Sequence, residues 1–224
     1  MRNDNYISRK HQLLKSFDKS ITRSKRVLIS RYGNEHTNSL ISKFRSEYEA
    51  LIPQIPYIGE MNPFLIFLLP TSRNLAIYRV LQRQGQTAEN AGQMIYEMIG
   101  ERYKAIPRLI RHMIGYLFFS RWSLGLAKKL ATESQKRKYP ESYVMTYVEG
   151  NGKDFDYGID YTECAICKFL SAQNALELIP YMCAADKIGS ELLGWGMSRT
   201  MTLAKGDEKC DFRFKKGGKT NILS

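Results

Sequence analysis

Four cysteines, one aspartate and one arginine have the types and spacing that could support chemistry in this chain. Cys164 and Cys167 stand in FDYGIDYTECAICKFL, where a strand-like run changes into a helix-like run. Thr162 occupies the position expected of the helix N-cap. A thiol near a helix N-terminus is favoured as a thiolate by unpaired N–H groups and by the helix dipole. The segment therefore predicts a chemically special thiol at Cys164 and a packing residue at Cys167.

A second candidate pair lies in PYMCAADKIG. Cys183 and Asp186 are three residues apart, so the expected helix places their thiol and carboxylate on one face. Burial on that face would raise the pKa of Asp186. A carboxyl group with a raised pKa is suited to orient a water molecule or to exchange a proton with a substrate. The pair is therefore predicted to be catalytic.

The segment GMSRTMTLAKGDEKCDFRFKKG predicts a hairpin that turns at Gly206-Asp207. This turn would set Leu203 opposite Cys210 and sort the side chains by parity. One face would carry Leu203, Cys210, Met201, Phe212, Arg199 and Phe214, and the other Thr202, Asp211, Thr200 and Arg213. Arg199 is then a charge among apolar groups. It either binds a substrate carboxylate or lies at the sheet's edge and pairs with a structural Asp or Glu.

The cysteines also allow other interpretations. Cys164-x2-Cys167, then fifteen residues, then Cys183-x2-Asp186 has the outer spacing of a four-ligand zinc site. Both pairs fall on expected helices without glycine-containing knuckles, so no metal is expected. A strand-to-helix CxxC also fits a thioredoxin-like motif locally, but the surrounding βαβ order is absent. Buried cysteines that act as small hydrophobes remain a further alternative.

The elements that must position these residues divide the chain into two halves. Residues 5 to about 134 have helical periodicity, interrupted at 53–63, Pro70, 85–87 and Pro107, with Thr87 as a helix cap. Strand-like composition begins after Pro140. We expect an α+β protein with a helical N-terminal half, then a hairpin, helices over about 164–193, a second hairpin and a polar tail. Four antiparallel strands are expected near 142–149, 155–161, 196–204 and 209–214, covered by helices.

Charge is concentrated at the N-terminus. The 224-residue chain has a formal charge of +12, and its first fifty residues hold eleven Lys/Arg against five Asp/Glu. Apolar residues at helical spacing predict an amphipathic helix with its cations in solvent: Leu14, Phe17, Ile21 and Leu28. This favours a basic helical arm at 1–50, packed on the body or on a second subunit, ahead of an α+β domain at 51–224. A homodimer is therefore expected. No nucleic-acid partner is expected, because the basic helix lacks a zinc-finger or basic-zipper context.

The cellular setting follows from the apolar runs. The longest, FLIFLL, is far shorter than a bilayer span, so no integral membrane segment is expected. The N-terminus lacks an apolar run beside a cleavage site, so no signal peptide is expected either. The sequence thus predicts a cytoplasmic protein with reduced cysteines.

Five segments in order resemble the L-2-amino-thiazoline-4-carboxylic acid hydrolase family: IPYIGEMNPF, FDYGIDYTECAICKF, ELIPYMCAAD, RTMTLAKG and CDFRFKKGG. The resemblance runs from about Tyr48 to Gly218. It implies hydrolysis of a cyclic amidine, with opening of the thiazoline ring to an N-carbamoyl-cysteine. The family's shared positions correspond here to Cys164, Cys183, Asp186, Arg199, Thr200, Thr202, Cys210 and Asp211. One departure is Glu60-Met61, where the family tends to have a polar stretch, and this implies a difference in substrate choice if the loop shapes the pocket.

The resulting functional hypothesis is a hydrolase that opens a small cyclic amidine or amide bearing a carboxylate, without a cofactor. Cys164, Cys183 and Asp186 are its candidate catalytic residues. The candidate substrate-binding residues are Arg199, Cys210, Thr200, Thr202 and Asp211. The alternative is a non-catalytic module for small or lipid-like molecules, since the order of elements is similar to that of vinyl-reductase-type ligand-binding domains. Convergence of the thiols and Asp186 on one polar site would favour the hydrolase, and an apolar cavity would favour the module.

Overall fold

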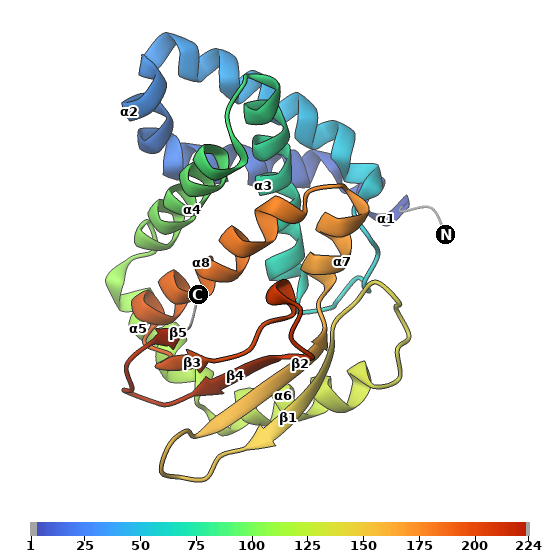
Figure 1. Cartoon of the computed structure of the whole chain (residues 1–224), viewed down its shortest axis with the longest axis vertical. Coiled ribbons are helices and arrows are strands. Elements are labelled where there is room, and N and C mark those ends of the chain that lie inside the picture. Colours follow the sequence, from blue (N-terminus) through green and yellow to red (C-terminus); the bar gives the residue numbers. More distant parts are fainter. Residues whose placement is uncertain (1–3, 223–224) are drawn as a thin grey trace. The chain divides into compact units, whose positions relative to one another are not determined.

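The computed structural model describes residues 4–222, and the chain divides into two compact units (Figure 1). Unit 1 comprises the residues up to 105 together with 168–182, and unit 2 comprises 106–167 together with the residues from 183 onward. Helices precede a sheet-containing half, so the expected α+β class is confirmed. The expected division at residue 50 is not tested by these units and stays a prediction.

Unit 1 is built from helices. Its elements are α1 (Asp4–Ser8), α2 (Lys10–Leu51), the 3₁₀ turn η1 (Ile52–Gln54), α3 (Leu65–Arg83), α4 (Ala88–Lys104), most of α7 (Ala165–Ala172), η2 (Leu176–Leu178) and the start of α8 (Ile179–Leu193). Helix α2 is bent at Gly33, whose φ of 71° and ψ of 172° are non-helical. Its two halves fold back on each other (Figure 1). Arg45 Nε, in the second half, donates to Asp18 Oδ1, in the first, at 3.1 Å. The basic segment is therefore a helical hairpin.

The apolar face of this basic segment is buried, as its spacing predicts. Phe17 and Leu28 have no exposed surface, and Ile21 and Leu14 are only 3% and 6% exposed. The ring of Phe17 stacks on that of Tyr48, from the other half of α2, with 5.1 Å between centroids. Because the face is already covered within unit 1, it gives no reason for a second subunit there. The homodimer stays a prediction.

Two local signals in unit 1 had different outcomes. Thr87 is the N-cap of α4 as predicted, and its hydroxyl accepts from the Asn90 amide at 3.1 Å. The interruption expected at Pro70 was wrong, because Pro70 lies inside α3. The proline is close to the start of the helix and removes only the one bond that its own N–H would have donated. The hydroxyl of Thr71 donates to the Phe67 carbonyl at 2.9 Å and supports the same turn.

Unit 2 carries the sheet. Its elements are α5 (Arg108–Phe118), α6 (Arg121–Ser134), β1 (Val144–Glu149), β2 (Tyr157–Glu163), most of α8, β3 (Met197–Arg199), η3 (Leu203–Lys205), β4 (Cys210–Phe214) and β5 (Asn221–Ile222). The strand order is β1-β2-β4-β3-β5. All pairs are antiparallel except β3 with β5. The expected four-stranded antiparallel sheet was therefore wrong in one respect, because the tail adds a short parallel strand.

The second hairpin also differs from the expected one. Its strands end earlier, and the 3₁₀ turn η3 replaces the two-residue turn at Gly206-Asp207. Met197 pairs with Phe214, whereas the expected register paired Arg199 with Phe214. This is a slip of two residues, and because side chains alternate with a period of two, Arg199 keeps its predicted place on the face of Phe212. The predicted face of Thr202 was wrong, because Thr202 lies beyond the end of β3 and its hydroxyl lies 3.5 Å from Cys210 Sγ, which was expected on the opposite face. The physical reason is that Asp207 accepts from the Thr202 amide at 2.7 Å and stabilises a wider loop.

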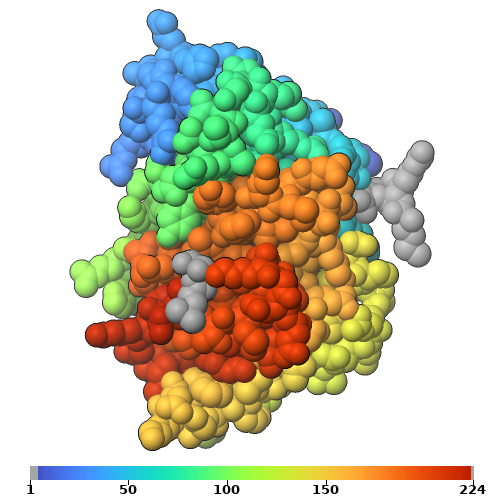
Figure 2. All heavy atoms as spheres, in the orientation of Figure 1, coloured from blue at the N-terminus to red at the C-terminus, as the bar shows by residue number. Residues whose placement is uncertain are grey.

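The two faces of the sheet differ in polarity. On one face the cross-strand pairs are Tyr157 with Phe214, Ile159 with Phe212 and Tyr161 with Cys210. On the other, Asp160 is bound by Arg213 at 2.7 Å and by Lys209 at 2.8 Å. The loop between β1 and β2, exposed at residues 151–154, forms part of the visible surface (Figure 2). Within residues 4–222, no helix combines the length and the apolar character needed to cross a bilayer.

Candidate functional site

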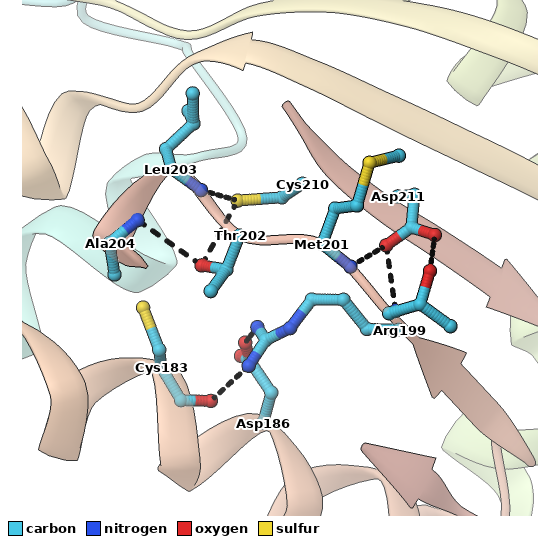
Figure 3. Close-up of polar contacts among 10 residues, drawn as sticks. Cys183, Asp186, Arg199, Met201, Thr202, Leu203, Ala204, Cys210 and Asp211 are labelled. Carbon is cyan, nitrogen blue, oxygen red and sulfur yellow. Dashed lines mark hydrogen bonds and ion pairs between the residues drawn. The ribbon is translucent and has the colours of Figure 1, made fainter. Parts of the chain in front are cut away.

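The candidate site is centred on an ion pair between α8 and β3 in unit 2. Arg199 Nη1 donates to Asp186 Oδ2 at 2.7 Å, and Nη2 donates to the Cys183 carbonyl at 3.3 Å (Figure 3). Arg199 is only 3% exposed, and its guanidinium lies 5.2 Å from the centre of the Phe212 ring. Strand β3 is internal, between β4 and β5, so Arg199 is not at the sheet's edge. Of the predicted alternative for Arg199, the pairing with an Asp is found, but the position at the edge of the sheet is not.

The carboxyl group of Asp186 is both accessible and poorly hydrated. Its side chain is 35% exposed, whereas its partner Arg199 is nearly enclosed. Surrounding protein withdraws the carboxyl group from bulk water, and this desolvation raises its pKa to about 6, although the charge and hydrogen bond of Arg199 oppose the shift. The predicted direction of the shift is therefore found. Asp186 changes protonation state close to neutral pH, which suits a group that exchanges protons.

Cys183 lies one helical turn before Asp186 on α8 and is partly exposed. Burial raises the pKa of its thiol to about 12, and the negative charge of Asp186 raises it further than Arg199 lowers it. Cys164 and Cys210 also act to raise the pKa of Cys183. At neutral pH Cys183 is therefore a neutral thiol beside a carboxylate that can accept a proton.

Cys164 directly precedes α7, at the strand-to-helix junction that the sequence predicts. The expectation of a favoured thiolate there was wrong. A hydrogen bond with Cys167 and burial raise the pKa of Cys164 well above its usual value, and the opposing backbone hydrogen bonds of Cys167 and Ile166 are weaker. The expected cap at Thr162 was also wrong, because this residue lies in β2 and its hydroxyl donates to the Val144 carbonyl at 3.4 Å.

Cys210 and Thr202 stabilise the turn between β3 and β4. The Leu203 amide donates to Cys210 Sγ at 3.3 Å, and the Ala204 amide donates to the Thr202 hydroxyl at the same distance (Figure 3). The Thr202 hydroxyl also lies 3.5 Å from Cys210 Sγ. Both side chains are buried. These contacts show that the two residues hold η3 in place, and a role in substrate binding stays a prediction.

Asp211 and Thr200 form a second brace. One oxygen of Asp211 accepts from the amides of Thr200 and Met201, at 2.8 Å and 2.6 Å, and the other accepts from the Thr200 hydroxyl at 2.5 Å. Burial acts to raise the pKa of Asp211, but these hydrogen bonds together lower it below its usual value. Asp211 is therefore an ionised group that fixes the chain directly after Arg199.

Two tyrosines belong to this region and were missed by the sequence analysis. Burial raises the pKa of Tyr143 and of Tyr161, and in both cases the charges of Cys164 and Asp186 contribute. Their rings meet edge to face, with centroids 5.8 Å apart. Tyr161 could have been found from its alternation in β2, because it shares the face that carries Cys210. Tyr143 lies before β1, where no periodic signal assigns a face.

The spacing that resembles a zinc site does not produce a metal-binding cluster in the described part of the chain. No group of three or more His, Cys, Asp or Glu among residues 4–222 is arranged to hold a metal ion. Asp186, the fourth ligand of that spacing, is engaged by Arg199 instead. The three partly exposed cysteines and the buried Cys210 are all free thiols.

Comparison with known proteins agrees with the sequence resemblance. The family model described as L-2-amino-thiazoline-4-carboxylic acid hydrolase matches residues 71–214. The match is shorter than the expected span of 48–218, so the IPYIGEMNPF segment lies outside it, but it contains every candidate site residue. No curated protein and no solved structure matches the chain. With more than half of its length matched, the chain belongs to the L-2-amino-thiazoline-4-carboxylic acid hydrolase family.

Proposed function

We propose that this protein hydrolyses a small cyclic amidine that bears a carboxylate, of the thiazoline-carboxylate class, and that Asp186 is its catalytic proton carrier. The observation that carries the proposal is the contact between Asp186 and Arg199. It holds a carboxyl group with a pKa of about 6 beside the neutral thiol of Cys183. Family membership supplies the reaction class, and the site supplies residues that fit it.

The ring opening balances with water as the only co-reactant. Ionised Asp186 takes a proton from a water molecule, whose oxygen then adds to the amidine carbon. The electron pair of the C=N bond moves to the ring nitrogen, which takes up the second proton of the water from the added hydroxyl group. As the hydroxyl oxygen forms the carbonyl C=O bond, the C–S bond of the tetrahedral centre breaks and its electron pair leaves with sulfur. Asp186 returns the proton to the departing sulfur. One residue can serve as base and then as acid because its pKa lies close to the pH of the reaction.

The cysteines have a different role in this proposal. A thiol whose pKa is raised to about 12 is present almost entirely as the weakly nucleophilic neutral form. We therefore assign Cys183 and Cys164 to contact with the reacting water or the ring, through their weak S–H donors. Cys210, Thr200, Thr202 and Asp211 hold the chain around them.

Arg199 primarily positions Asp186. Two of its three nitrogens already donate, to the Asp186 carboxylate and to the Cys183 carbonyl, while its buried Nε has no hydrogen-bond partner. A substrate carboxylate would have to share these donors, so the predicted binding of substrate by Arg199 requires rearrangement of the pair. The polar character of the site favours the hydrolase over a non-catalytic ligand-binding module.

The proposal is tested by incubating the purified protein with L-2-amino-thiazoline-4-carboxylate and following the release of a free thiol. Mass spectrometry of the product should show the mass of substrate plus one water, as ring opening requires. A related cyclic amidine without the carboxylate should react more slowly. Binding of the thiazoline without any product, at all pH values from 5 to 9 (roughly the range over which active-site carboxyl and thiol groups titrate), would contradict the proposal and support a binding module.

A further inference from the structure

Helix α5 presents an apolar face to solvent. Leu109, Met113, Tyr116 and Leu117 are 82%, 54%, 67% and 49% exposed. Counted from Leu109 they occupy positions i, i+4, i+7 and i+8, so they lie on one side of the helix. Amphipathic helices of globular proteins normally turn the apolar side toward the core. The exposed side of α5 is therefore a candidate contact surface.

This exposure does not come from a helix that lacks contacts with its own unit. A Cβ added at Gly115 would lie 2.1 Å from the Leu193 carbonyl oxygen, so the backbone of α5 directly touches the end of α8. On the same side, the ring of Phe118 stacks on that of Trp195, with 4.6 Å between centroids, and meets Phe214 at 5.0 Å. Helix α5 thus packs through one side and leaves its second apolar side outward.

A further exposed aromatic residue, Trp122, follows the end of α5 by four residues in the first turn of α6 and is 77% exposed. Lys216 Nζ lies 5.0 Å from the centre of the Tyr116 ring and places a cation beside the apolar residues. Arg108 and Arg121 adjoin Leu109 and Trp122 in the chain and are exposed. Neither arginine has a carboxylate partner within the described residues.

The surrounding segment is strongly basic. Residues 108–138 contain eight Lys/Arg and one Asp/Glu. Lys128, Lys136 and Arg137 pair with carboxylates, and the other five cations have no carboxylate partner within the described residues. A second copy of the chain docked through the same surface would bring two such segments together, and like charges oppose that contact. Nucleic acid would satisfy the cations but would leave the exposed Leu, Ile and Met side chains without apolar contact.

An anionic membrane surface fits both properties. Apolar and aromatic side chains enter the boundary between headgroups and acyl chains, while Lys and Arg contact the phosphates. Trp and Tyr favour this boundary. We propose that the face made by α5 and the first turn of α6 binds anionic bilayers, with Leu109, Met113 and Trp122 inserted and Arg108 and Arg121 at the headgroups. This peripheral binding site is independent of the hydrolase site and of the reaction proposed for it.

The test uses the full chain and sedimentation with vesicles. The protein should sediment with vesicles of phosphatidylcholine and phosphatidylglycerol, and only weakly with phosphatidylcholine alone. Because one cation near a charged membrane changes binding roughly fivefold, Arg108→Gln combined with Arg121→Gln should weaken it roughly twentyfold. Leu109→Ser combined with Trp122→Ser should also weaken vesicle binding, while the change of binding with salt concentration should stay the same as in the wild type.

Matched controls distinguish this face from a general effect of charge or of apolar exposure. Arg23 and Lys43 on α2 are exposed cations, and Met61 is 93% exposed. Arg23→Gln with Lys43→Gln, and Met61→Ser, should bind vesicles like the wild type, and circular dichroism should show all variants folded. The proposal is overturned by absence of vesicle binding, by equal binding to neutral vesicles, or by equal losses in the controls. Self-association in light scattering that Leu109→Ser abolishes would overturn it in favour of a second copy.

Discussion

At the scale of single residues, the defining feature is that burial and charge act in opposite directions on Asp186. Desolvation raises its pKa and Arg199 lowers it, and the result is a value of about 6. Burial also keeps the Cys183 thiol neutral, and a hydrogen bond with Cys167 together with burial does the same for Cys164. The cysteines, Asp186 and Arg199 of the candidate site could be picked out from the sequence, whereas Tyr143 and Tyr161 were missed. The protonation states of the site residues could not be predicted, because they depend on side-chain contacts and on enclosure by other segments. At Cys164 the hydrogen bond with Cys167 and burial outweigh the backbone hydrogen bonds at the helix start.

The pH dependence of turnover follows from this balance. If ionised Asp186 takes the proton from water, kcat/KM should rise with pH through about 6 and then level off. Asp186→Asn should remove this rise from whatever activity remains. The test is to measure kcat/KM from about pH 5 to 8 by following the release of the thiol. If kcat/KM of Asp186→Asn rises with pH as that of the wild type does, the titration belongs to another group.

The same shift predicts how stability changes with pH. Asp186 binds its proton more tightly in the folded chain, with a pKa of about 6 against an ordinary value of 3.8. Its contribution to folding is therefore complete below pH 4 and is lost as the pH rises through 6. The free energy of unfolding of the wild type, minus that of Asp186→Asn, should fall over this window in urea titrations. A difference that stays constant or grows would contradict the shift.

At the scale of elements, the connection between β3 and β4 decides whether Arg199 and Asp186 meet. The sequence predicted the correct face for Arg199, because parity survives a register shift of two residues. It predicted the wrong turn and the wrong face for Thr202, because the turn depends on side-chain contacts such as that of Asp207 with the Thr202 amide. The strand β5 was missed for a related reason. It has only two residues, Asn221 and Ile222, and a strand this short carries no periodic signal.

Asp211 should be the main stabilising residue of this connection. Asp211→Ala removes three hydrogen bonds to a charged, buried carboxylate and leaves the amides of exposed Thr200 and half-buried Met201 without that acceptor. We expect the free energy of unfolding to fall by roughly 3 kcal/mol. Asp154, which accepts from Asn151 in an exposed loop, provides the control, and Asp154→Ala should change stability by less than about 1 kcal/mol. Similar losses in the two variants would show that Asp211 has no special role.

At the scale of the whole molecule, the basic first fifty residues were predicted to contain an amphipathic helix, and α2 (Lys10–Leu51) forms a bent helical hairpin. Apolar spacing identified the buried side, but the fold-back at Gly33 was not predicted, because one glycine in a long periodic run is compatible with a straight helix. Because the apolar face of α2 is buried within unit 1, it gives no support to the expected dimer. The oligomeric mass of the full chain, measured by light scattering over a range of concentrations, tests it, and a constant monomer mass would end the prediction.

The central claim is that Asp186 carries the proton in ring opening, and comparison of single variants with L-2-amino-thiazoline-4-carboxylate tests it most directly. We expect Asp186→Asn to lower kcat at least about 100-fold, because general acid–base catalysis contributes on the order of 10²–10⁴. Cys183→Ser and Cys164→Ser should lose less, and Cys167→Ala should stay near the wild type. Near wild-type turnover by folded Asp186→Asn would contradict this role. A second contradicting result would be a loss of turnover in Cys183→Ser as large as that in Asp186→Asn, observed together with a covalent substrate adduct on the wild-type protein.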